Sequence, residues 1–426
     1  MLPEAATTSA EAPSRRRRPR REFPALRHRN FRLFVVGQGI SLVGYWMQSV
    51  AQGWLVVHRL HGSALDLGMV AAAGYLPLSL APLAGVVADR LPRRRVLLVT
   101  QTLLMLLAAG LGLLVWTDLV SVRLVICFAA CVGLVSALDV PTRQSFLVEM
   151  TTPEDLPNAI AFNSSIFNGA RVVGPAVAGI LLDLVGEAPC FFANAVSYVA
   201  VLIALASMRI ARAERAPHAQ PLGAGFVSGL RYVRGNPVLR NLLVLLGIVC
   251  GLGVQYNLLL PIFANSVFDA GARGYGLLLT AAGIGSMTSS LQLAARRYSR
   301  AEHRRHLLVG LVLFAVAVLG LAASPRLGIA LGCQAFAGWG MVRYLATTNT
   351  LLQLVVDEPY RGRVMGLHTV MFLGTQPIGG LLLGALAQHF GARRAACFSG
   401  TISFAAAGWL AIRLRRAALR ARTTAG

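Results

Sequence analysis

Lysine is absent from this chain of 426 residues, and charged residues of any kind make up only 13% of it. All 40 basic residues are arginine; with 17 acidic residues they give a formal net charge of +23. Hydrophobic residues account for 56% of the chain. A soluble fold of this length cannot bury so much apolar surface. The shortage of charge therefore excludes ordinary soluble domains and predicts a membrane protein.

Cysteine is also scarce, and sequence motifs for several kinds of chemistry are missing. The six cysteines lie in or beside apolar stretches, without a neighbouring cluster of metal-ligating residues. We expect no metal, no cofactor and no structural disulfide. No nucleotide-binding loop or hydrolase elbow occurs, so neither an enzyme nor an ATP-driven pump is expected. The arginines flank apolar segments instead of forming one basic face, which argues against nucleic-acid binding.

Long apolar runs recur along nearly the whole chain. Most approach the ~20 residues that a helix needs to cross ~30 Å of hydrocarbon. Reading the runs between charges predicts twelve transmembrane helices at 31–57, 66–89, 96–117, 121–142, 158–185, 189–208, 238–266, 273–295, 306–324, 326–350, 362–390 and 394–413. The predicted fold is thus an all-α integral membrane protein of two six-helix halves.

Arginine also divides the chain and sets its orientation. The predicted regions are a disordered arginine-rich tail, a first half, a linker, a second half and a basic tail, at 1–30, 31–208, 209–237, 238–413 and 414–426. Arginine is concentrated in both tails, the linker and alternate connections, and such segments stay in the cytoplasm. Both termini are therefore predicted to be cytoplasmic, with the protein a multi-pass component of the plasma (inner) membrane.

Two motifs carry a family resemblance. The run from Gly85 to Arg95 resembles the G-x-x-x-D-R-x-G-R-R signature of the major facilitator superfamily, with Pro92 in place of its last glycine. Residues 163–179 resemble the fifth-helix signature of exporters, whose core is G-P-x-x-G-G, with Ala178 in place of one glycine. The resemblance extends over residues 30–415 and is strongest to the subgroup of enterobactin-type exporters and multidrug efflux proteins.

The resemblance implies a cytoplasmic gate and a hinge. In the gate, Asp89 would face the N-terminal end of the eleventh helix, where unpaired N–H groups favour negative charge. The residues assigned to the gate are Gly85, Asp89, Arg90, Arg93, Arg94, Arg143 and Arg363. In the fifth helix, the expected hinge and packing residues are Gly169, Gly174, Pro175 and Gly179, packed against Gly283 and Gly285 of the eighth helix.

Charged and polar groups far from the loops are candidates for binding, because burying them in a membrane is costly. Arg171 and Arg343 are the two arginines farthest from any loop, and for Arg171 a structural role stays equally open. With the helices that the resemblance places on a central cavity, the predicted substrate-binding residues are Gln48, Gln52, Arg171, Gln255, Tyr256, Asn257, Trp339, Arg343 and Tyr344. A mixed aromatic and amide surface suits an amphipathic organic molecule.

Acidic residues are missing from the predicted mid-membrane positions, so proton coupling follows from the resemblance alone. The two weak candidates for a titrating group are His368 and Asp183. The predicted function is secondary active export of a drug, siderophore or metabolite by alternating access, with protons as coupling ion and a monomer as the working unit. An importer of a small solute and a membrane receptor or scaffold without a transport cycle are the alternatives.

Overall fold

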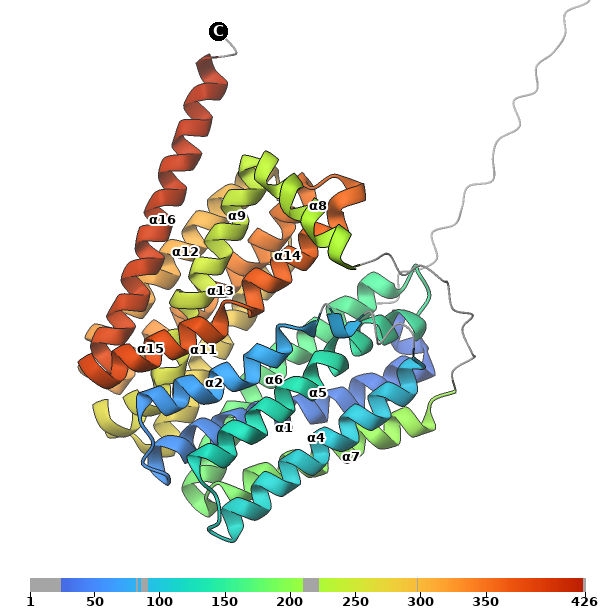
Figure 1. The fold of residues 1–426 in the computed structure, drawn as a ribbon, viewed down its shortest axis with the longest axis vertical. Coiled ribbons are helices and arrows are strands. Elements are labelled where there is room, and N and C mark those ends of the chain that lie inside the picture. The colour runs from blue at the N-terminus through green and yellow to red at the C-terminus, as the bar shows by residue number, and fades with distance from the viewer. Residues whose placement is uncertain (1–23, 82, 86–90, 210–221, 297, 424–426) are drawn as a thin grey trace, which may run out of the picture.

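The computed structural model describes residues 24–81, 83–85, 91–209, 222–296 and 298–423. Within these ranges the chain is helical and contains no strand. Two bundles of helices lie against each other (Figure 1). We call residues 24–209 the N-terminal half and residues 237–423 the C-terminal half.

The N-terminal half is built from long helices joined by short connections. These helices are α1 (Arg29–His58), α2 (Ala64–Leu78), α4 (Arg93–Trp116), α5 (Val122–Glu149), α6 (Leu156–Val185) and α7 (Ala188–Ser207). The start of α2 is fixed by a capping box: the Ser63 hydroxyl accepts from the Asp66 N–H at 3.2 Å, and the Asp66 carboxylate accepts from the Ser63 N–H at 2.7 Å. Such reciprocal bonds satisfy two backbone donors that the helix leaves free.

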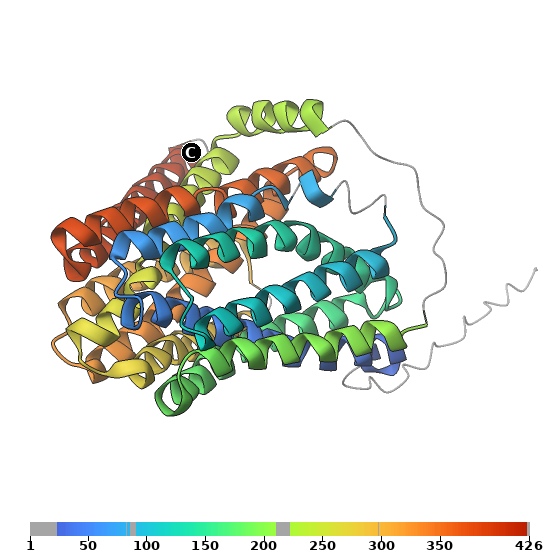
Figure 2. The same ribbon diagram turned by 60° about the horizontal axis from the view of Figure 1, so that its bottom comes forward.

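The C-terminal half follows the same plan after the linker. Its helices are α9 (Pro237–Ile248), α10 (Leu260–Ile262), α11 (Gly271–Ala294), α12 (Arg300–Ala323), α13 (Leu327–Val355), α14 (Arg361–Leu373), α15 (Gln376–Phe390) and α16 (Ala392–Thr423). Before them, α8 (Leu222–Gly235) lies on the outside of the bundle (Figure 2), where Gly229 packs against Arg363 of α14. The predicted linker thus contains a helix of its own.

Ten helical segments of the described chain are long and apolar enough to cross a membrane. They include 237–267 and 358–390, each counted as one segment. The apolar α2 is shorter, at 15 described residues. The 29-residue α13 has the length but carries Gln334 and Arg343 among its buried residues, which makes it more polar. The architecture is that of a multi-pass membrane protein.

Two of the segments predicted as single helices are interrupted. Between α9 and α11 the chain passes through π turns at Val249–Gly253 and Phe263–Val267 and a 3-10 turn at Val254–Leu259. Between α14 and α15 the interruption falls just before Pro377. Proline has no backbone N–H and clashes with the preceding turn, so a helix tends to break or restart at it.

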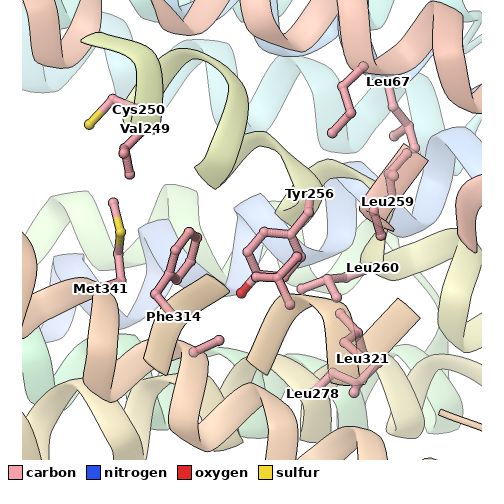
Figure 3. Packing of buried hydrophobic residues seen from close by; sticks show 14 of the residues in the cluster. Leu67, Val249, Cys250, Tyr256, Leu259, Leu260, Leu278, Phe314, Leu321 and Met341 are labelled. Carbon is pink, nitrogen blue, oxygen red and sulfur yellow. The ribbon is translucent and has the colours of Figure 1, made fainter. Parts of the chain in front are cut away.

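Most members of the largest buried apolar cluster lie in the C-terminal half. Figure 3 shows Tyr256 beside Phe314, with ring centroids 5.9 Å apart. Tyr256 is 2% exposed, and its hydroxyl donates to Gln334 Oε1 at 2.9 Å. The same apolar cluster includes Leu67 of α2 and so joins both halves.

The halves touch chiefly through two helix pairs, α2 with α15 and α6 with α11. In Figure 1, α2 and α15 run side by side.

The two ends of the bundle differ in their connections. We call the end with connections 59–63, 117–121 and 186–187 the far end, and we call the end from which the linker leaves the terminal end. Glycines line both pairs near the far end: a Cβ on Gly68 would lie 2.5 Å from the Gly380 oxygen, and one on Gly276 would lie 2.7 Å from the Pro175 oxygen. The two backbones therefore meet with no room for a side chain.

A Gly276→Ala substitution should destabilise the protein by about 1–3 kcal/mol, because the added methyl group overpacks the contact between α6 and α11. Gly169→Ala is the matched control, since a Cβ there would meet nothing within 4 Å. Its effect should be neutral or stabilising by up to about 1 kcal/mol, because alanine favours helix more than glycine does. Thermal unfolding of the detergent-solubilised variants measures both, and equal midpoints would contradict the close contact.

Candidate functional site

At the far end the two halves are held together by polar and aromatic contacts as well as by glycine. Arg273 Nε of α11 lies 2.8 Å from Asp183 Oδ2 of α6. Trp54 of α1 stacks on Tyr275 of α11 with ring centroids 6.3 Å apart. Asp183, one of the two predicted titrating groups, is therefore half of an ion pair that bridges the halves.

Toward the terminal end the same helices lose these contacts. The close glycine contacts between α6 and α11 stop at Gly283, whose added Cβ would lie 2.8 Å from the Arg171 oxygen. Beyond this point α6 exposes Phe167 and Ile160, and α2 exposes Leu76. The ribbons of the two bundles diverge in this direction (Figure 1). The halves are closed at the far end and apart at the terminal end.

Arg171 lies where α1, α6 and α11 meet. Its guanidinium carbon is 5.7 Å from the centroid of the Trp46 ring, a cation–π distance. The helices bring these two side chains together because Gly174, one turn further on, lets α6 lie against the Trp46 Cβ and the α1 backbone at Val43 and Met47. Trp46 also makes edge contacts with Tyr45 and Phe167, at 5.6 and 5.7 Å between centroids. Arg171 forms no hydrogen bond or ion pair with a described residue.

A half-buried guanidinium with aromatic neighbours and no carboxylate partner can bind an anionic or aromatic group of a ligand. Of the predicted substrate-binding residues, Arg171 is the one whose charge lies between the halves and is not already paired. Gln52, on the same helix as Trp46, is half-buried and likewise forms no hydrogen bond with a described residue. Together they form the candidate site.

The other predicted amides have partners close by. Gln48 Oε1 accepts from Asn194 Nδ2 at 2.6 Å, which ties α1 to α7. Gln255 and Asn257 each donate to a nearby backbone carbonyl at 3.0 Å, on Cys250 and Val254. Both carbonyls lie in the interrupted segment, where regular helical bonds are lost, so the amides compensate for its geometry.

The predicted aromatic and arginine positions on the tenth helix lie within the C-terminal half. Arg343 stacks on Trp339, with its guanidinium carbon 4.1 Å from the ring centroid, and faces α11 and α12. Tyr344 is fully buried, and Tyr256 lies in the core described above. The structure therefore keeps Arg343 and Tyr344 within the C-terminal half, away from the space beside Arg171.

The predicted gate lies at the terminal end, and it is only partly within the described chain. Asp89 and Arg90 fall outside the described residues. Arg93 Nη1 is 2.6 Å from Glu149 Oε1, so the basic end of the motif is paired with the end of α5. Arg94 donates to the Leu205 and Ala206 carbonyls at 2.8 and 2.7 Å. These bonds hold the start of α4 against the end of α7.

The remaining gate and hinge residues have separate surroundings. Gly85 faces Pro141 of α5, and the Arg363 guanidinium carbon lies 5.4 Å from the Tyr360 ring centroid. In the fifth-helix signature, the Pro175 carbonyl and Gly179 contact Gly276 of α11. Gly283 also faces α6 as expected, whereas Gly285 faces α13 instead.

Sequence reasoning missed a buried carboxylate cluster. Asp139 of α5 is 1% exposed and accepts hydrogen bonds from Thr100 Oγ1 and Gln101 Nε2 at 2.7 and 2.8 Å. Arg143 Nη2 lies 3.1 Å from the Asp139 carboxylate, and Arg143 Nη1 donates to Gln38 at 2.8 Å. The spacing of Asp139 and Arg143 on one helix face was the available signal. Arg143, assigned to the gate by the resemblance, is paired with Asp139 in this structure.

His368, the other predicted titrating group, lies on α14. Its ring stacks on Phe372 with centroids 6.2 Å apart, and its Nε2 is buried without a partner in the described chain. No group of three or more metal-ligating side chains converges within the described residues.

The two helical bundles close on each other at one end. Between them lies an arginine, Arg171, beside aromatic rings and without an ion-pair partner among the described residues. This is the arrangement of a membrane transporter. Solved structures share this fold. A D-xylose–proton symporter aligns with a TM-score of 0.70 at 14% identity, covering 89% of this chain and 96% of that one. A bacterial homologue of the lysosomal transporter Spinster, in an inward-facing and occupied conformation, also gives 0.70, at 15% identity, covering 91% of this chain and 97% of that one.

The profile of the family described as transmembrane secretion effector matches residues 21–425, and the chain belongs to this family of major facilitator transporters. It is 27% identical over 365 residues to the staphyloferrin A transporter of Staphylococcus aureus, covering 84% of this chain and 89% of that protein. It is 29% identical over 366 residues to the multidrug efflux pump Tap of Mycolicibacterium fortuitum, covering 83% and 87%. The superfamily resemblance predicted from the two motifs is confirmed, and the chain is a transporter, not an enzyme.

Removing one member of the buried Asp139–Arg143 pair should cost about 3–5 kcal/mol, because it leaves an uncompensated charge. We expect Arg143→Gln to lower the unfolding midpoint sharply and the double variant with Asp139→Asn to recover part of the loss. Asp183→Asn breaks a half-exposed pair and should cost only about 0–1 kcal/mol. Thermal unfolding in detergent compares the three. If Arg143→Gln and Asp183→Asn lower the unfolding midpoint equally, the Asp139–Arg143 cluster is not buried as described.

Proposed function

We propose that this transporter exports a small amphipathic organic molecule by alternating access, in exchange for protons. The observation that carries the proposal is Arg171 beside Trp46, without a hydrogen-bond or ion-pair partner among the described residues, between two halves whose close glycine contacts lie toward the far end. A ligand entering from the terminal end meets a cation and an aromatic face together. Molecules with a negative group and an apolar or aromatic body complement that surface.

The direction of transport depends on orientation. Adding α2 and α13 to the ten candidate spans gives the twelve crossings of our proposal, an even number that would leave both termini on one side. Arginine is sparse near the far end, where the described residues are Arg59, Arg123, Arg273, Arg326, Arg393 and Arg394. The positive-inside rule then makes the terminal end cytoplasmic. In this orientation the conformation is open to the cytoplasm, ready to load a molecule for export.

Relatives support transport of organic molecules, and the efflux pump among them supports export. The names of two of them, a staphyloferrin A transporter and a multidrug efflux pump, concern a siderophore and drugs. Each of the two similarities extends over more than four fifths of this chain and of the relative. Export of a siderophore, drug or metabolite across the plasma membrane is the function that these names and the candidate site favour in common.

Proton coupling needs a group whose partner changes with conformation. Asp183 is paired with Arg273 across the halves at the closed far end. Opening this end for release separates the two groups, which leaves the carboxylate free to take up a proton from outside. His368 on α14 has an unpartnered buried nitrogen and is the second candidate.

Flux in proteoliposomes tests the proposal. With fluorescein as an anionic aromatic probe, ethidium as a cationic one and a carboxylate siderophore as a third, an imposed pH gradient should drive transport of at least one, and nigericin should abolish it. Arg171→Gln removes a charge-assisted contact of about 1.5–3 kcal/mol and should weaken the apparent affinity for the anionic probe about tenfold or more.

Arg240→Gln is the control, because Arg240 is exposed on α9 and has no partner among the described residues. If Arg171→Gln and Arg240→Gln lose the same apparent affinity for the anionic probe, the substrate does not bind at Arg171 between the halves. Flux that persists after the gradient collapses would contradict proton coupling. Saturable binding without flux, under every gradient, would favour the receptor or scaffold.

A further inference from the structure

A polar cavity lies wholly within the C-terminal half. It has a volume of about 470 Å³ and opens between the end of α11, the start of α12 and the middle of α13. Among its lining residues are Gln292, Arg296, Tyr298, Arg305, His306 and Arg343. None of these helix surfaces takes part in the close contacts between the halves, so the cavity is separate from the candidate transport site.

Arg343 forms the inner wall of this cavity. It is 7% exposed, and its Nη2 donates to Gln292 Oε1 at 3.1 Å while its Nη1 lies 3.2 Å from His306 Nδ1. Its Nε is buried and has no partner in the described part of the chain. A buried guanidinium costs several kcal/mol of desolvation, which neutral partners do not offset as an anion would.

The remaining walls add positive charge. Arg296 and Arg305 line the cavity with Arg343, and among its described lining residues Glu302 is the single carboxylate. Glu302 is already engaged: one of its oxygens accepts from the Ser299 N–H at 2.7 Å to cap α12, and the other lies 3.8 Å from Arg296. The described part of the wall therefore holds three guanidinium groups and one carboxylate, with His306 able to add a further donor.

Aromatic contacts hold this arrangement in place. Tyr298 packs edge-on against His306, with ring centroids 4.5 Å apart, and the Arg296 guanidinium carbon lies 5.6 Å from the Tyr298 ring centroid. Trp339 carries the Arg343 guanidinium on its face and donates its ring N–H to Gln292 at 3.1 Å. Positioned guanidinium groups match the tetrahedral oxygens of phosphate, which can accept several donors at once.

We propose that this cavity binds a phosphate group. The same chemistry comes from two sources, the headgroup of an anionic phospholipid and a free phosphate or phosphate ester. The cavity lies at the terminal end, where anionic headgroups of the cytoplasmic leaflet are within reach in the proposed orientation. Occupancy neutralises Arg343 and fastens α11, α12 and α13 to one another.

Adjacent arginines on α12 provide a matched test. Arg305 lines the cavity, whereas Arg304 is exposed, does not line it and has no partner among the described residues. Purified full-length protein in a neutral detergent is titrated with sodium phosphate, against sodium chloride at equal ionic strength, while its unfolding midpoint is followed. We expect saturable stabilisation by phosphate alone, and about tenfold weaker apparent binding in Arg305→Gln, as expected for losing one charge-assisted contact. Arg304→Gln should match the wild type.

Lipid and free phosphate are then separated by native mass spectrometry of protein released from nanodiscs. Retention of phosphatidylglycerol over phosphatidylcholine by the wild type, reduced in Arg305→Gln and displaced by inorganic phosphate, identifies a headgroup site. Stabilisation by phosphate without lipid retention identifies a soluble ligand. Identical phosphate responses in Arg304→Gln and Arg305→Gln, or equal stabilisation by chloride, would overturn the proposal. Arg343→Gln, if it folds, should behave as Arg305→Gln does. None of these readouts depends on transport.

Discussion

The contact between glycine-lined helix surfaces is the constraint on which the rest of this structure depends. Gly68 and Gly384 meet across α2 and α15, and Gly179 and Gly276 meet across α6 and α11. Inside a bilayer, helices gain little from hiding apolar surface, because lipid tails are equally apolar, so close backbone packing has to supply the attraction. Since both contacts lie toward the same end, the halves are joined there and can separate at the other end without breaking either bundle.

This arrangement explains where charge is tolerated. Within each half, buried charge is paired or hydrogen-bonded, as in the Asp139–Arg143 cluster of the N-terminal half. Between the halves, Arg171 has an aromatic partner and no ion-pair partner among the described residues, and Asp183 has a partner from the opposite half. Charges within one half stabilise a rigid bundle. The interactions of charges between the halves change with the relative orientation of the two bundles. Alternating access requires this division, because rigid halves must move while the interactions between them change.

Much of the fold could be predicted from the sequence, since apolar runs of the right length define helices regardless of their surroundings. Of the glycines expected to pack the fifth helix against the eighth, Gly179 contacts α11, Gly174 packs on α1 and Gly169 meets no neighbour, while Gly285 faces α13. Which side of a helix faces inward was harder to predict. A soluble helix shows its buried face as an apolar stripe, but a membrane helix is apolar on both faces, so periodicity loses its information. For this reason the sequence did not distinguish Arg171 between the halves from Arg343 within one half, or reveal that Tyr256 belongs to the core. The interruptions at Val249–Gly253 and Phe263–Val267 were missed because a few π turns leave composition unchanged.

The central claim is that two rigid halves rock about their glycine contacts, and distances between spin labels test it most directly. In a variant with the six native cysteines replaced, one pair of labels is placed at the terminal end, on the exposed Glu154 and Glu358, and another at the far end, on the exposed Leu119 and Pro325. Pulsed electron paramagnetic resonance in nanodiscs, with and without a transported probe and at two pH values, gives both distances. The account predicts that the Glu154–Glu358 distance shortens under conditions in which the Leu119–Pro325 distance lengthens. Two distances that stay fixed under every condition, or that change in the same direction, would contradict it.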